Sequence, residues 1–94
     1  MTFSAQETLR KIGGNRFIAM TGANNFVKGR NYIQFKVPKA KNKIKYVKIT
    51  LNPMDTYDIE FQTRTGKLVK RVDGVYDDQL QDIFTENTGL DTHL

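Results

Sequence analysis

Six lysines lie between residues 36 and 48, and these side chains are the ones best suited to binding a ligand. Lysine ammonium groups contact phosphates and raise affinity for polyanions such as nucleic acid. Two tyrosines lie nearby in the sequence, and exposed tyrosines stack on unpaired bases. The predicted nucleic-acid-binding residues are Lys28, Arg30, Tyr32, Lys36, Lys39, Lys41, Lys43, Lys45, Tyr46 and Lys48. The alternative interpretation is a solvated face that keeps an exposed sheet from aggregating.

Residues for nucleophilic catalysis are almost absent. Ser4 is the only serine and His93 the only histidine, and Ser4 fits the N-cap of a helix instead. The chain has no cysteine, which excludes disulfides and thiolate metal sites. We therefore expect a protein that is not an enzyme and that uses no metal or cofactor.

Three acidic residues near the middle of the chain suggest one alternative to this expectation. Asp58 and Glu60 point to one side of a predicted strand, and Asp55 lies in the adjacent turn. Carboxylates grouped in this way hold Mg²⁺ in metal-dependent nucleases. The simpler interpretation is that Asp58 and Glu60 pair with Lys48 and other lysines of the neighbouring strand.

The charges are divided unequally along the chain, which has a net charge of +5 over 94 residues. Residues 1–72 hold all 15 Lys and Arg against four acids, giving +11, whereas residues 73–94 hold six acids and no Lys or Arg, giving −6. Such polarity favours binding to a polyanion. The acidic part offers a second surface, to a basic partner or to a second copy of the chain, unless it is only a solvated helix face. Its predicted interface residues are Asp77, Asp78, Asp82 and Glu86.

The central elements form a β-hairpin within residues 43–62. Apolar and polar residues alternate in both arms, which is typical of half-buried strands. Residues of one face must oppose each other across an antiparallel pair. The predicted pairs are Val47 with Phe61, Ile49 with Ile59 and Leu51 with Tyr57, and the same register sets Lys48 against Glu60.

The remaining elements are placed by shorter patterns. A capping box at Ser4 and Glu7 predicts a helix over about residues 4–12. The apolar run at residues 15–21 predicts the first strand, and residues 22–25 a turn after it. Residues 31–37 predict the second strand and residues 68–72 the fifth, whereas residues 26–30 are ambiguous.

The last element is a helix whose apolar stripe is spaced i, i+4, i+7 and i+8. The stripe consists of Tyr76, Leu80, Ile83 and Phe84, with Asp73 as a possible cap and Gly89 at the C-terminal stop. The expected fold is α+β: an antiparallel meander of about five strands with a short N-terminal and a longer C-terminal helix on one face. We expect one domain over residues 1–94, with 91–94 as a frayed tail.

No apolar run approaches the ~20 residues of a membrane helix, and the N-terminus lacks a signal-peptide core. We therefore expect a cytoplasmic protein.

Two segments, LRKIGGNRFIAMTGANNFV (residues 9–27) and YVKITLNPMDTYDIEF (residues 46–61), resemble small orphan proteins encoded by bacteriophages and other mobile elements. The resemblance implies a binding role in the cytoplasm of a bacterial host: to nucleic acid, to a host enzyme, or as an inhibitor of defence such as an anti-CRISPR protein. It carries no catalytic signature. Anti-CRISPR proteins that imitate DNA are often strongly acidic, and the first 72 residues depart from that pattern.

Two functions are therefore expected from the sequence. The first is a small binding protein whose lysine-rich sheet face and loop engage nucleic acid or a nucleoprotein complex. The alternative is an anti-defence inhibitor that acts by protein–protein contact, through the acidic helix or a sheet edge. A homodimer is compatible with either.

Overall fold

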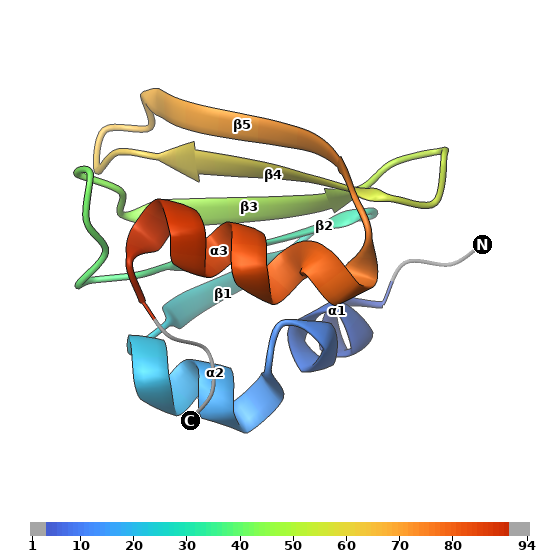
Figure 1. Cartoon of the computed structure of the whole chain (residues 1–94), viewed down its shortest axis with the longest axis horizontal. Coiled ribbons are helices and arrows are strands. Elements are labelled where there is room, and N and C mark those ends of the chain that lie inside the picture. The colour runs from blue at the N-terminus through green and yellow to red at the C-terminus, as the bar shows by residue number, and fades with distance from the viewer. Residues whose placement is uncertain (1–3, 91–94) are drawn as a thin grey trace.

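Five antiparallel strands form one sheet in which each strand pairs with its neighbours in the chain (Figure 1). The computed structural model describes residues 4–90, so His93 and the tail at 91–94 lie outside the described residues. The strands are β1 (Asn24–Lys28), β2 (Tyr32–Lys36), β3 (Tyr46–Leu51), β4 (Tyr57–Gln62) and β5 (Leu68–Val75). The predicted α+β class and five-stranded meander are confirmed.

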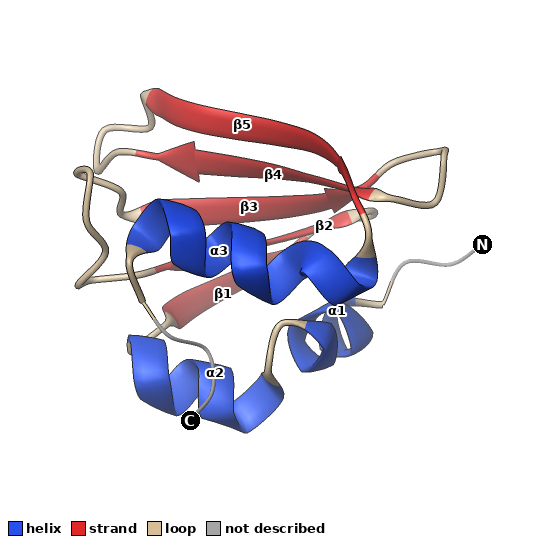
Figure 2. Ribbon diagram, in the orientation of Figure 1, coloured by secondary structure: helices blue, strands red, loops and turns tan. Residues whose placement is uncertain are grey.

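Helices cover one face of the sheet (Figure 2). They are α1 (Ala5–Lys11), α2 (Gly14–Thr21) and α3 (Leu80–Thr88), with a 3₁₀ turn η1 (Asp77–Gln79) leading into α3. Ser4 caps α1 as predicted, because its Oγ accepts a hydrogen bond from the Glu7 backbone N–H at 3.2 Å. Among the described residues, no helix is long and apolar enough to cross a bilayer.

The strand predicted at residues 15–21 is wrong, since this segment is helix α2. Phe17 and Thr21 are buried four residues apart, which is a helical spacing, and the Thr21 hydroxyl donates to the Phe17 carbonyl at 2.7 Å. Gly22, with φ of 69°, ends the helix in the left-handed region that glycine tolerates. A short apolar run fits a buried helix as well as a strand, so periodicity alone did not decide between them.

The first strand of the sheet lies instead in the segment that the sequence left ambiguous. All five residues of β1 are exposed, so this edge strand shows no alternation of apolar and polar positions. Its pairing with β2 is interrupted between Asn24 and Val27, where Asn25 has φ of 55°. The predicted turn at 22–25 is therefore shorter than expected.

The predicted register of the central hairpin is confirmed at every position. Val47 pairs with Phe61, Ile49 with Ile59 and Leu51 with Tyr57, and Lys48 lies opposite Glu60. The apolar row of β4 is buried, and so are Val47 and Ile49 of β3. This row faces the helices, and the polar row forms the outer face of the sheet.

The C-terminal part differs from the prediction in two details. β5 continues to Val75, so Asp73 lies within the strand and does not cap the helix. Tyr76 is 61% exposed instead of joining the apolar stripe. Leu80 and Phe84 are fully buried, and Gly89 ends α3 with φ of 75°, as predicted.

Three phenylalanines join the helical layer to the sheet. The Phe17 ring of α2 lies 5.2 Å from Phe35 of β2 and 5.1 Å from Phe84 of α3, both in edge-to-face contact. All three side chains are at most 1% exposed. Aromatic pairs in this geometry add stabilisation beyond the burial of their area.

This packing predicts a stability difference within α2. Replacing Phe17 by Ala should lower the free energy of unfolding by about 3–5 kcal/mol, the usual cost of a large cavity in a core. Met20→Ala in the same helix removes a side chain that is 38% exposed and serves as the control. Urea unfolding followed by circular dichroism measures both. Equal losses would contradict the packing of α2.

Candidate nucleic-acid interface

The connection between β2 and β3 presents lysines on a fixed backbone. Val37 and Ile44 are buried near its two ends, while Lys39, Lys41 and Lys43 between them are exposed. The Val37 N–H donates to the Lys45 carbonyl at 2.8 Å and closes the base of the loop. The apolar anchors thus direct the intervening ammonium groups into solvent.

The same loop is attached to the C-terminal end of α3. The Lys41 backbone N–H donates to the Thr88 carbonyl at 2.8 Å, and Asn42 Nδ2 donates to the Asn87 carbonyl at 3.1 Å. Carbonyls in the last turn of a helix have no partner within the helix. The loop supplies hydrogen-bond donors to two of these carbonyls, and these bonds fix the loop backbone that carries the lysines.

Lys43 has an unusual backbone conformation. Asn42 and Lys43 have φ of 62° and 63°, and the Ile44 N–H donates to the Lys41 carbonyl at 3.2 Å. These are the features of a type I′ turn, in which Asn is common at the first central position and Gly at the second. A lysine in this region is disfavoured because its Cβ crowds the backbone. The turn therefore carries a charged side chain where glycine would be less strained.

A second basic loop, which the sequence analysis did not identify, lies at the same end of the sheet (Figure 1). The turn between β4 and β5 carries Arg64 and Lys67, both exposed. The Lys45 backbone N–H donates to the Gln62 carbonyl at 2.8 Å, which places the two loops side by side. A meander returns every second connection to the same end, so the strand order already contained this signal.

Lys36 and Tyr46 continue the basic region onto the outer face of the sheet. They are cross-strand partners, and Gln62 lies on the other side of Tyr46. Both side chains are partly exposed. Lys45 is partly held by the fold, because its Nζ donates to the Pro38 carbonyl at 2.8 Å.

Four of the predicted residues are not part of this group. Lys28 and Arg30 flank the turn between β1 and β2, which lies at the opposite end of the strands. Lys48 Nζ lies 4.5 Å from the centroid of the Tyr32 ring, in a cation–π contact. The Tyr32 ring also rests directly against Gly29 and occupies the space that a Cβ there would need. Of the two tyrosines, Tyr46 is the one beside the basic loops.

We define the basic end as Lys36, Lys39, Lys41, Lys43, Lys45, Arg64 and Lys67, with Tyr46 at its border. Within residues 4–90, none of these seven cations has a carboxylate within 4.0 Å. Glu86 lies near the end of α3, and its side chain is exposed and forms no ion pair within the same residues. Within the described part of the fold, none of the cations of the basic end is therefore held in an ion pair.

One arginine forms ion pairs with the carboxylates of the outer sheet face. Arg71 of β5 lies 3.7 Å from Asp58, 3.9 Å from Glu60 and 2.7 Å from Asp73. The hydrogen bond and charge of Asp73 raise the pKa of Arg71, with smaller contributions from Glu60 and Asp58. The expected pairing of Glu60 with Lys48 is thus replaced by pairing with Arg71. Within residues 4–90, no three acidic or histidine side chains are grouped closely enough to hold a metal ion.

The predicted acidic face divides in two. Asp77 Oδ2 lies 3.5 Å from Lys11 Nζ of α1, whereas Asp78, Asp82 and Glu86 are exposed at intervals of four residues. Burial alone would lower the pKa of Lys11, but the nearby Tyr57 and Asp77 outweigh it and raise this pKa. The raised pKa of Lys11 contributes stability below about 10.4, the ordinary lysine value, and this contribution is lost as the pH rises through the raised value.

Comparison with family models, curated proteins and solved structures finds no match for this chain. The function must therefore be argued from the geometry and charges of the site.

The strained turn predicts that Lys43→Gly raises the free energy of unfolding by about 0.5–1 kcal/mol, because glycine occupies the left-handed region without a Cβ clash. Lys39→Gly is the control: it removes the same charge at a position whose φ is not positive, and it should lower stability. Chemical denaturation measures both. A loss of stability in Lys43→Gly would contradict the turn geometry.

The arginine network predicts that Arg71→Gln lowers the melting temperature, because Asp58, Glu60 and Asp73 would then repel one another. The loss should shrink at 1 M NaCl, where the Debye length is about 3 Å. Lys70→Gln on the same strand, which removes the same charge from an exposed residue, should have a smaller effect. Equal melting temperatures for the two variants would argue against the network.

Proposed function

We propose that this protein is a non-enzymatic nucleic-acid-binding protein that contacts the phosphate backbone with its basic end. The observation that carries this proposal is the convergence of seven cations from two loops and a strand, none of them ion-paired within residues 4–90. Lysine and arginine side chains that neutralise phosphates release counterions, and this release drives binding.

The backbone of the basic end supports binding over simple solvation. Solubility needs charge at the surface but no fixed arrangement of it. Here the loop is attached to α3 by two hydrogen bonds, and Lys43 occupies a strained turn position. Backbone strain of this kind is found more often where function requires it. A rigid loop also loses less conformational entropy on binding.

Tyr46 favours a nucleic acid with unpaired bases as the ligand. It lies between Lys36 and Gln62 on the outer sheet face, which is not covered by the helices. A base that leaves its stack can pack on such a ring while the lysines contact the adjacent phosphates. The target, in keeping with the resemblance to phage proteins, is nucleic acid alone or within a nucleoprotein complex.

Fluorescence anisotropy with labelled single-stranded and duplex oligonucleotides across a salt series tests the proposal. Changing Lys41 and Lys43 together to Gln should weaken binding by tenfold or more at about 150 mM salt. The slope of log K against log salt should fall in magnitude by about 1.4–1.8, since each of the two lost phosphate contacts contributes about 0.7–0.9.

The control changes Lys28 and Arg30 together to Gln, which alters the net charge equally at the opposite end of the strands. It should retain binding within about twofold, since the contacts are local. Equal loss in both variants would mean that net charge alone attracts the oligonucleotide. The absence of binding even at low salt would refute the proposal.

A further inference from the structure

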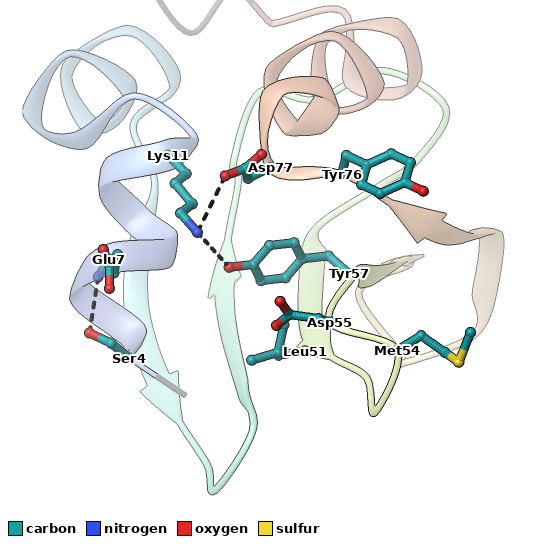
Figure 3. Close-up of a pocket in the computed structure, with 9 residues that line it drawn as sticks. All are labelled: Ser4, Glu7, Lys11, Leu51, Met54, Asp55, Tyr57, Tyr76 and Asp77. Carbon is teal, nitrogen blue, oxygen red and sulfur yellow. Dashed lines mark hydrogen bonds and ion pairs between the residues drawn. The ribbon is translucent and has the colours of Figure 1, made fainter. Parts of the chain in front are cut away.

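The end of the molecule opposite the basic end contains a hollow of about 430 Å³ (Figure 3). Its walls come from one side of α1, the turn between β3 and β4 with the adjoining strand ends, and the junction of β5 with η1. It is lined by Ser4, Glu7, Lys11, Leu51, Met54, Asp55, Tyr57, Tyr76 and Asp77.

The charges of this hollow are opposite to those of the basic end. Glu7, Asp55 and Asp77 supply three carboxylates against the single ammonium of Lys11. Lys11 is already engaged, because its Nζ lies 3.5 Å from Asp77 Oδ2 and donates to the Tyr57 hydroxyl at 3.5 Å. Glu7 and Asp55 have no ion-pair partner within residues 4–90. The hollow therefore attracts a cation, and it repels phosphates.

Large apolar side chains stand exposed at the rim of the hollow. Met54 is 82% exposed and Tyr76 is 61% exposed. Methionine and tyrosine are enriched in the cores of protein–protein interfaces. A dissolved metal ion would gain nothing from these two side chains, whereas the apolar stem of a long side chain or its neighbouring residues would cover them.

The turn that carries Met54 is held by its own hydrogen bonds. Asn52 Oδ1 accepts from the Met54 N–H at 2.9 Å and from the Thr56 N–H at 3.2 Å. Asn52 Nδ2 donates to Thr56 Oγ1 at 2.8 Å and to Asp58 Oδ1 at 2.9 Å. Met54 is thus presented on a preorganised turn, which lowers the entropic cost of docking.

We propose that this hollow is a docking site for an arginine or lysine side chain of a partner protein. The cationic group pairs with the carboxylate of Asp55, within the negative field of Glu7 and Asp77, and the residues around it pack on Met54 and Tyr76. Charge-assisted hydrogen bonds to carboxylates hold the cationic group, and a tyrosine ring adds a cation–π contact. This inference does not depend on nucleic-acid binding at the basic end.

The test is an NMR titration of the ¹⁵N-labelled full chain with acetyl-Gly-Leu-Arg-Leu-Gly-amide. The probe peptide should shift the amides of Met54, Asp55, Tyr57, Tyr76 and Asp77 in a saturable way at millimolar concentration. The same peptide with citrulline, which is neutral and nearly isosteric with arginine, should bind at least tenfold more weakly. Equal shifts with both peptides, or none at 10 mM, would refute the proposal.

Variants locate the contact. Asp55→Asn combined with Asp77→Asn should weaken the arginine peptide about tenfold; asparagine suits the φ of 66° at residue 55. Asp78→Asn in η1 combined with Asp82→Asn in α3 makes the same charge change at two exposed residues outside the hollow, and it should change binding less than twofold. Circular dichroism melts confirm that each variant is folded. Equal weakening in both variants would contradict a local site.

A second copy of this chain is the competing occupant, because it carries lysines on its basic end. Sedimentation velocity of the unmodified protein should show a monomer. An oligomer that is dissociated both by the Asp55/Asp77 change and by the Lys41/Lys43 change would overturn the proposal in favour of head-to-tail self-association.

Discussion

The contact among Phe17, Phe35 and Phe84 is the interaction on which the rest of the structure depends. It joins α2, β2 and α3 through ring centroids that lie 5.1–6.4 Å apart. With α3 fixed across the sheet, the carbonyls at its C-terminal end meet the Lys41 N–H and the Asn42 side chain. The position of the lysine loop thus follows from the packing of the core.

The meander topology then brings the two basic connections together at one end of the sheet. Each strand reverses direction, so the connections alternate between the two ends of the sheet (Figure 1). The connections after β2 and β4 form the basic end, and the turn after β3 lies with the acidic hollow at the other. A net charge of +5 conceals this division. A nucleic acid at one end and a basic protein side chain at the other would not compete for the same surface.

Much of the fold and of the basic end could be predicted from the sequence, and the predictions that failed did so for physical reasons. Strict alternation fixed the register around Ile49, because a one-residue slip would expose a whole apolar row. The helix at Phe17 was missed because a short apolar run suits both kinds of structure, and exposed edge strand β1 has no alternation to detect. Lys48 contacts the Tyr32 ring instead of Glu60, and Glu60 pairs with Arg71. This choice of side-chain rotamer depends on tertiary contacts, which a local sequence pattern does not contain.

The measurement that tests the account most directly is the mapping of amide chemical shifts when a short single-stranded oligonucleotide is added to the ¹⁵N-labelled protein. The account predicts shifts in residues 36–46 and 62–67, and unchanged amides in the turns at 29–31 and 52–56. Shifts confined to those two turns, or spread evenly over the surface, would contradict binding of the nucleic acid at the basic end.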